Sequence, residues 1–241
     1  LKNIKAIGSG RQGKVFKVSQ TGTDFVIKVA PYDNSAKSRG EPQPFQVEFD
    51  NQKAVMDVAS NGVVHVYKTF RCIDFVKPSE LNMKNVQNSA KFDKSKQGII
   101  VMEYCDGGSL ASWLKTATLS DAVFKKLIGQ VIGTLHAIKV HLPHFNHNDL
   151  HMENVFVSKE RGFLIGDFGW SRTKASGTNP AVNTANGTST ASFWGVGPKT
   201  DPRYDHHLFL NELATWISKH NPSKYPETMK FLNHAIPAGY R

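Results

Sequence analysis

Two aspartates and one asparagine, each beside a short apolar run, are the residues of this sequence best suited to chemistry. Asp149 and Asn154 belong to the stretch His147-Asn148-Asp149-Leu150-His151-Met152-Glu153-Asn154, and Asp167 follows the apolar run Leu164-Ile165. Carboxylate and amide oxygens are hard donors that suit Mg²⁺, and a carboxylate can also accept a proton from a substrate hydroxyl. One Asp beside a turn is usually a cap or turn residue, whereas this ordered set favours a site.

A glycine-rich stretch near the N-terminus could approach a phosphate group. Residues Gly8-Ser9-Gly10-Arg11-Gln12-Gly13-Lys14-Val15 have the pattern G-x-G-x-x-G-x-V, and glycines let backbone N–H groups come close to phosphate oxygens. A dinucleotide-binding loop would lead into a helix, whereas residues 15–18 are typical of a strand. Taken alone, the loop fits a glycine-rich hairpin equally well.

Lys28 follows Phe25-Val26-Ile27 in a predicted strand. An isolated strand lysine is usually solvated, but an inward-facing one needs an anion or a carboxylate partner. Glu48 is the best candidate partner, because it lies on a helix that we expect to begin near Phe45. An exposed position on that helix is the alternative for Glu48.

The predicted elements divide the chain into a strand-rich first part and a helix-rich second part. Strands are expected within residues 1–30, 63–76 and 98–102, with a loop over 31–44 and a polar, Lys-rich insertion over 77–98. Helices are expected from about 45, over 110–114, from Ser120 as N-cap through 138, and over about 205–219 and 224–235. This order predicts an α+β fold whose two lobes meet near residues 103–108.

Composition excludes several classes of protein. The 241 residues carry a net charge of +10 and are 39% hydrophobic, and no apolar run approaches the ~18 residues of a membrane span. Two cysteines, Cys72 and Cys105, cannot build a disulfide framework, so we expect an intracellular location, cytoplasmic by default, with the nucleus or a host cytoplasm as alternatives. No leader pattern opens the sequence, and its first residues look like the edge of a domain. The positive charge could help to bind nucleic acid, an anionic surface or a phosphate-bearing ligand, but the sequence contains no recognised nucleic-acid-binding motif.

Taken in order, these motifs resemble those of the protein kinase superfamily. The matching parts are the glycine-rich loop 8–15, Lys28, the hinge-like stretch 102–110, the catalytic-loop-like stretch 147–154 and Asp167-Phe168-Gly169. The resemblance runs from Ile4 to about Trp216. It implies one domain over 1–241 with the bilobal protein-kinase-like fold: a small β-rich N-lobe (about 1–102), a hinge (about 103–108) and a reduced helical C-lobe (about 109–241).

The resemblance also implies the roles of individual residues. Asp149 would orient and deprotonate a substrate hydroxyl, Lys28 would hold the α- and β-phosphates of ATP, and Asn154 and Asp167 would bind Mg²⁺, with Mn²⁺ as a possible substitute. An apolar residue of the second lobe, Val155 or Phe156, would face the base opposite Val15. The implied nucleotide-binding residues are Ile7, Gly8, Ser9, Gly10, Gly13, Val15, Lys28, Glu48, Met102, Glu103, Cys105 and Ser109.

The sequence departs from the usual kinase pattern in three places. Asn148 replaces the arginine that commonly pairs with a phosphorylated residue, so we predict that activity does not require phosphorylation through this route. His151 replaces the lysine typical of serine/threonine kinases and resembles the loops of aminoglycoside and choline phosphotransferases. No Ala-Pro-Glu follows residue 167, so residues 193–198 are expected to anchor that segment by packing. Asp205, with Asp201 as its rival, is expected to brace the catalytic loop.

We therefore expect a monomeric protein kinase that transfers the γ-phosphoryl group of ATP to Ser or Thr hydroxyls of protein substrates. Its compact pattern faintly resembles the kinases of large DNA viruses. A small-molecule phosphotransferase is the first alternative, and a pseudokinase scaffold or a basic nucleic-acid-binding module are others. The ten histidines lack zinc-site spacing, the insertion 77–98 is expected to be a solvated loop, and Cys105 is expected to be inert.

Overall fold

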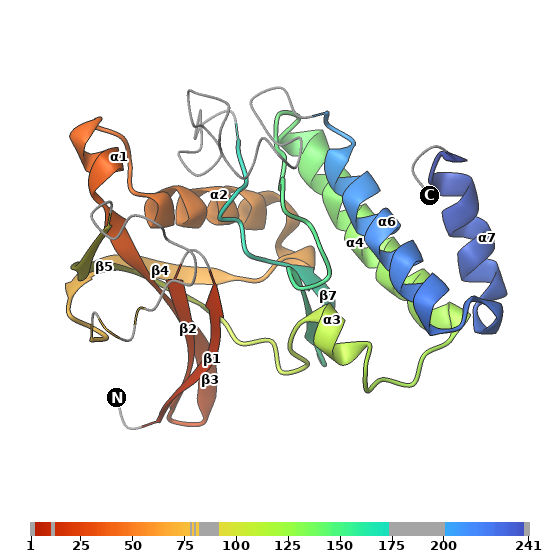
Figure 1. Cartoon of the computed structure of the whole chain (residues 1–241), viewed down its shortest axis with the longest axis horizontal. Helices are drawn as coiled ribbons and strands as arrows, with labels where there is room; N and C mark the ends of the chain where they lie inside the picture. Colours follow the sequence, from red (N-terminus) through yellow and green to blue (C-terminus); the bar gives the residue numbers. More distant parts are fainter. Residues whose placement is uncertain are drawn as a thin grey trace.

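A five-stranded antiparallel sheet is followed by a mainly helical part (Figure 1). The computed structural model describes residues 3–10, 13–77, 79, 81, 92–173 and 201–238. In the sheet, of order β1-β2-β3-β5-β4, the strands are β1 (Ile4–Gly10), β2 (Gly13–Gln20), β3 (Thr23–Asp33), β4 (Val66–Ile73) and β5 (Phe92–Glu103). A separate hairpin pairs β6 (Val155–Ser158) with β7 (Gly162–Ile165). The predicted α+β fold is confirmed.

The helices flank these strands. The sheet part contains α1 (Asn34–Ser38), α2 (Pro44–Ala59) and the short 3₁₀ turn η1 (Ser60–Gly62). The second part contains α3 (Leu110–Trp113), α4 (Asp121–His141), α6 (Tyr204–His220), η3 (Pro222–Lys224) and α7 (Pro226–Ala235). The predicted cap of α4 is present, since the Ser120 hydroxyl accepts a hydrogen bond from the Val123 N–H. None of the helices described is long and apolar enough to cross a membrane.

Two predicted loops are partly regular structure. Within 31–44, β3 continues to Asp33 and α1 follows, capped by the Asp33 side chain, which accepts from the N–H groups of Ser35 and Ala36. Pro31 pairs with Gln97 of β5, and among the described residues the pairing of β2 with β3 ends at Val29, so the proline lies beyond that ladder, where its missing N–H is tolerated. Within the predicted insertion 77–98, β5 already begins at Phe92, and residues 82–91 lie outside the described part of the chain.

Alternation along β3 decides which way Lys28 points. Ile27 and Val29 pack in one hydrophobic cluster, whereas Ala30 packs in another with Phe45 of α2. Successive side chains of a strand point to opposite faces, so Lys28 shares the α2 face with Ala30. The strand pattern and the helix on that face together bring the lysine towards α2.

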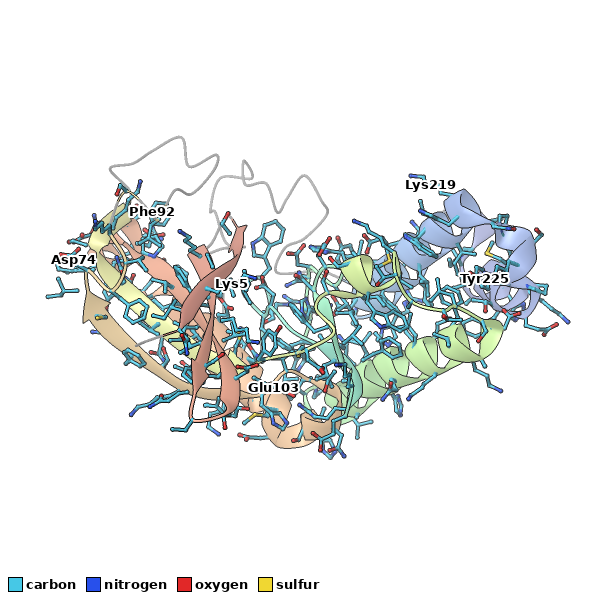
Figure 2. All side chains as sticks on the ribbon, turned by 90° about the horizontal axis from the view of Figure 1, so that it is seen from below. Lys5, Asp74, Phe92, Glu103, Lys219 and Tyr225 are labelled. Atoms are coloured by element: carbon cyan, nitrogen blue, oxygen red, sulfur yellow. The ribbon has the colours of Figure 1, made fainter. Side chains whose placement is uncertain are left out.

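A second hydrophobic core forms around α4, between the β6–β7 hairpin and the helices α6 and α7. Its fully buried members include Phe124, Leu127 and Leu135 of α4, with Phe209 and Leu213 of α6. Figure 2 shows Glu103, the last residue of β5, at the junction between the sheet and this helical part. The lobe boundaries given above stay a prediction.

Candidate active site

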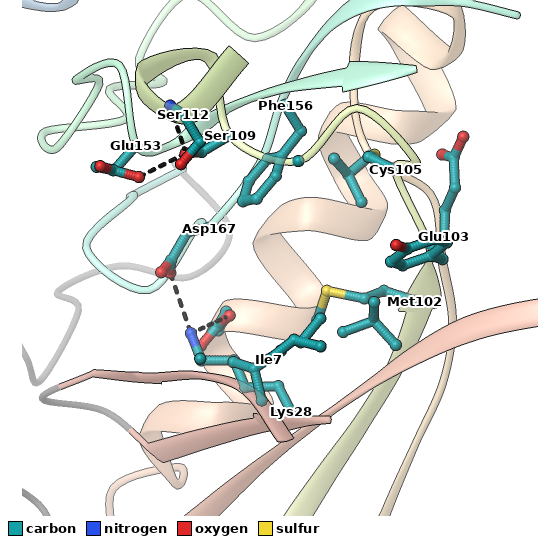
Figure 3. Close-up of a pocket in the computed structure, with 17 residues that line it drawn as sticks. Ile7, Lys28, Met102, Glu103, Cys105, Ser109, Ser112, Glu153, Phe156 and Asp167 are labelled. Carbon is teal, nitrogen blue, oxygen red and sulfur yellow. Dashed lines mark hydrogen bonds and ion pairs between the residues drawn. The ribbon is translucent and has the colours of Figure 1, made fainter. Parts of the chain in front are cut away.

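A cavity of about 430 Å³ lies where the sheet meets the helical part (Figure 3). Nine of the predicted nucleotide residues line it: Ile7, Gly8, Val15, Lys28, Glu48, Met102, Glu103, Cys105 and Ser109. Ser9 and Gly13 instead line an adjoining cleft of about 750 Å³, together with Asp149 and Asn154. The backbone of Gly10, at the end of β1, pairs with that of Gly13 at the start of β2. Lys28, Val15 and Asp167 line both spaces, so the cavity and the cleft are continuous at these residues.

The Lys28 ammonium lies between two carboxylates. Its Nζ is 2.7 Å from Oε1 of Glu48 and 3.0 Å from Oδ1 of Asp167. Lys28 and Glu48 are 6% and 2% exposed, so the predicted partnership holds and the solvated alternative for both residues is wrong. Burial raises the pKa of Glu48 to about 7 in spite of Lys28, and the ammonium holds the pKa of the more exposed Asp167 carboxyl below its usual value. The pKa of Lys28 itself is raised by the two carboxylates, which outweigh its burial.

The β6–β7 hairpin brings Asn154 and Asp167 together. Val155 pairs with Ile165, and the Gly166 N–H donates to the Asn154 carbonyl at 2.9 Å. Asn154 therefore enters the hairpin beside the point where Asp167 leaves it. The Asn154 amide donates to the Asp149 carbonyl at 2.8 Å and lies 3.3 Å from the Asp149 carboxylate oxygen Oδ2. Asp149, Asn154 and Asp167 thus share one cleft.

The donor set fits a divalent metal that arrives with a ligand. Both hydrogen bonds described for the Asp167 carboxylate use Oδ1, one from Lys28 and one from the Gly169 N–H. The Asn154 Nδ2 group is occupied by Asp149, which directs the amide's own oxygen elsewhere. Among the described residues, no group of three or more His, Cys, Asp or Glu side chains could hold a metal ion by itself. A metal here would therefore use Asp167 Oδ2 and the Asn154 oxygen and complete its shell with water and phosphate oxygens.

Asp205 braces the catalytic-loop-like stretch, as predicted. It is fully buried, and its two carboxylate oxygens accept the backbone N–H groups of His147 and Asn148, each at 2.8 Å. Its rival Asp201 is a poorer brace, since its side chain binds the exposed Arg203 and only its carbonyl meets Asn146. The N-terminus of α6 thus holds the backbone on which Asp149 sits.

Replacing Asp205 by Ala should destabilise the protein by about 2–6 kcal/mol, because two buried N–H groups lose their acceptor and each costs about 1–3 kcal/mol. We expect a lower urea midpoint in equilibrium unfolding. Asp201→Ala is the matched control on the neighbouring exposed aspartate and should change the midpoint little. Equal midpoints for the two variants would contradict the bracing role.

The connection after β5 is held by a network that the sequence did not indicate. The Glu103 side chain accepts the His65 N–H at 3.0 Å and binds Arg161 of the β6–β7 turn, and Arg161 also donates to the carbonyl of Val63 at 3.0 Å. The Glu103 N–H donates to the His65 carbonyl, so a role in binding adenine would fall to the Glu103 carbonyl. A charged residue in a hairpin turn carries no sequence signal for such contacts.

The cavity also decides between the two apolar candidates opposite Val15. Of the two alternatives, Phe156 lines the cavity, whereas Val155 is fully buried in the core around α4. Strand alternation explains the difference, since adjacent residues of β6 face opposite sides.

Cys105 lies 7% exposed in the cavity wall, and burial raises its pKa to about 12. Because the thiolate is the reactive form, we expect a maleimide reagent to label Cys72, which is partly exposed, well before Cys105. Mass spectrometry of peptides from the folded protein at pH 7.5 measures both rates. Faster labelling of Cys105 would show that the cavity wall opens in solution.

Asn148 and His151 replace the residues usual in kinases and make contacts of their own. The Asn148 amide donates to the Trp170 carbonyl at 2.9 Å. His151 Nε2 lies 3.6 Å from Asp149 Oδ1, and this nearby carboxylate raises the pKa of His151. The predicted anchor at 193–198 lies outside the described residues, and independence from phosphorylation stays a prediction.

Comparison with known proteins identifies the family. The sequence matches the family model of the protein kinase domain over residues 1–191. It is 29% identical over 183 residues to the interferon-induced, double-stranded RNA-activated protein kinase of Rattus norvegicus, covering 74% of this chain and 33% of that protein. It is 26% identical over 177 residues to the serine/threonine-protein kinase cds1 of Schizosaccharomyces pombe, covering 73% of this chain and 36% of that protein. The match thus spans about a third of the length of each relative. With Lys28, Asp149, Asn154 and Asp167 gathered at one cleft, the match over most of its length places this chain in the protein kinase family.

Proposed function

We propose that this protein transfers the γ-phosphoryl group of ATP to Ser or Thr hydroxyls of protein substrates. The observation that carries the proposal is the position of Lys28, which is paired with Glu48 and Asp167 where the cavity and the adjoining cleft meet. A nucleotide in the cavity would place its phosphates at this ammonium and its terminal phosphate near Asp149.

Each side chain has a role that its surroundings support. Lys28 would offset negative charge on the phosphates, and Glu48 would keep its ammonium from rotating away. Asp149, with its side chain about a third exposed in the cleft, would orient the substrate hydroxyl and accept its proton. Asn154 and Asp167 would hold Mg²⁺ or Mn²⁺, which when bound would neutralise charge that develops on the phosphate oxygens.

The preference for Ser and Thr is supported by the relatives, since cds1 is named a serine/threonine-protein kinase. The volume of the cleft beside Asp149, about 750 Å³, supports a protein segment as the acceptor, and one side of the cleft is formed by Tyr204, Leu208 and Asn211 of α6. His151 favours a second candidate, a small-molecule phosphotransferase, because it stands where protein kinases of this type usually have lysine. A monomeric state, an intracellular location and a kinship with viral kinases remain predictions.

A phosphotransfer panel tests this proposal. The protein would be incubated with radiolabelled ATP and Mg²⁺ or Mn²⁺, with basic and acidic protein substrates in one arm and aminoglycosides and choline in the other. We expect acid-stable label on protein, which partial acid hydrolysis should identify as phosphoserine or phosphothreonine. Label only on small molecules would favour the second candidate. No label in either arm, without any ATP-dependent rise in melting temperature, would overturn both.

A further inference from the structure

Helix α2 carries two buried polar side chains one helical turn apart. Glu48 and Asn51 are 2% and 1% exposed, and residues three apart on a helix lie on the same side. Glu48 binds Lys28, as described above. Asn51 instead reaches the chain that follows Asp167-Phe168-Gly169, 120 residues further along the sequence.

Both the nitrogen and the oxygen of the Asn51 side-chain amide bind this segment, residues 171–173. Its Nδ2 group donates to the Ser171 carbonyl at 2.8 Å, and its Oδ1 accepts from the Thr173 hydroxyl at 3.2 Å. Ser171 and Thr173 are themselves 0% and 5% exposed. Such contacts between buried groups are costly to lose, because each group left without a partner keeps its desolvation cost.

The opposite side of the same segment is attached to the catalytic loop. The N–H groups of Asn146 and Arg172 donate to each other's carbonyls at 3.2 and 2.9 Å, and Asn148 donates to the Trp170 carbonyl. Residues 170–173 therefore lie between the loop that carries Asp149 and the helix that carries Glu48. Asn51 supplies the helix side of this connection.

We propose that Asn51 is a positioning residue, whose amide ties α2 to residues 171–173 and so keeps Glu48 on Lys28. Without the amide, α2 keeps its apolar contacts with the sheet but loses its polar attachment to the segment beside Asp167. The turn of α2 that carries Glu48 would then be held less firmly, and Glu48 could withdraw from Lys28. This inference rests on the proposed phosphotransfer for its kinetic test, and hydrogen exchange tests it separately.

The kinetic test is a double-mutant cycle between Asn51→Ala and Glu48→Gln. We expect Asn51→Ala alone to lower kcat/KM for ATP by about 10- to 100-fold, as small misplacements of catalytic groups do. In the Glu48→Gln background, Asn51→Ala should lower kcat/KM for ATP by less than about twofold, because Asn51 is proposed to act through Glu48, which is already replaced. If the loss of kcat/KM in the double variant equals the product of the losses in the two single variants, the two residues act independently and the proposal is overturned.

Gln46→Ala is the matched control. Gln46 is another amide of α2, partly exposed, whose Nε2 group binds Asp50 on the same helix. This control should keep kcat/KM for ATP within about twofold of the wild type. If Asn51→Ala does not fold, Thr173→Val can replace it, because it removes the hydroxyl that binds Asn51 and keeps the shape of the side chain. Thr173→Val should lower kcat/KM for ATP less than Asn51→Ala does, and this loss should also shrink in the Glu48→Gln background.

Hydrogen exchange of the ATP-free proteins distinguishes the two proposals. We expect faster exchange in α2 and in residues 166–173 for Asn51→Ala but not for Gln46→Ala, with α4 unchanged. Unchanged exchange in a folded Asn51→Ala protein would overturn the positioning role even if the wild type is an active kinase. Faster exchange in a protein whose wild type transfers no phosphate would overturn the proposed function and leave the attachment of α2 established.

Discussion

Asp149→Asn should lower kcat for phosphotransfer by about three orders of magnitude. The substitution removes the carboxylate proposed to accept the hydroxyl proton, and positioned acid–base groups contribute about 10²–10⁴-fold. Asp149 lines the cleft and is not part of the lining of the adjoining cavity. KM for ATP should therefore change by less than about threefold, since the lost interaction is made mainly in the transition state.

Steady-state kinetics with a phosphorylatable protein would measure both parameters. Asp57→Asn is the matched control, because Asp57 is an exposed carboxylate paired with Lys53 on α2 and should leave kcat unchanged. More than a tenth of the wild-type kcat in Asp149→Asn would contradict the assignment of the base.

The same variant has a second readout that does not depend on turnover. The Asp149 carboxylate raises the pKa of His151, so loss of its charge should let that pKa fall towards the ordinary histidine value. NMR titration of the imidazole would measure the shift. An unchanged pKa would mean that the two side chains do not interact in solution.

Lys28→Met should lower kcat/KM for ATP by at least about 100-fold, since removing one preorganised charge from a transition state typically costs about 10²–10³. Lys28 is also the charge that balances Glu48 and Asp167. Breaking a buried ion pair by removing one partner typically costs about 3–5 kcal/mol of stability, and protonation of the remaining carboxyl can reduce that cost.

This coupling makes the stability of Lys28→Met depend on pH in a defined direction. Burial already raises the pKa of Glu48 to about 7, and loss of the ammonium should raise it further. A carboxyl whose pKa is higher in the folded than in the unfolded protein binds more protons when the protein is folded. Stability therefore falls as the pH rises from the pKa of the unfolded state, about 4.5, towards the pKa of the folded state. The variant should therefore melt closer to the wild type at pH 6 than at pH 8.

Melting curves at these two pH values would test the expectation. Lys53→Met is the matched control, since Lys53 is exposed and pairs with Asp57 at 3.3 Å on the surface of α2. Its melting temperature should be near that of the wild type at both pH values. A deficit of Lys28→Met that is the same at pH 6 and pH 8 would show that Glu48 does not take up a proton when its partner is lost.

The sequence alone determined the family and most of the elements, because their signals are local. The order of the glycine-rich loop, Lys28, the stretch 147–154 and Asp167 needs no knowledge of packing. The cap of α4 at Ser120 and the apolar pattern of the strands depend on residues a few positions apart. The extra length of β3 and β5 was missed, since it depends on pairing between residues about 60 apart, such as Asp33 with Phe92.

Only the tertiary structure decided which side chains meet. Lys28 could have been solvated, Asp201 could have replaced Asp205, and Val155 could have faced the base, and the sequence left each of these alternatives open. The contacts of Asn51 with Ser171 and Thr173 had no sequence signal at all. These contacts join residues from 20 to more than 100 positions apart, as with Lys28 and Glu48, and they exist because strand alternation and helix packing place particular faces together. A pattern of residue types indicates which faces of a helix or strand are apolar, whereas the packed fold determines which partner each buried polar side chain contacts.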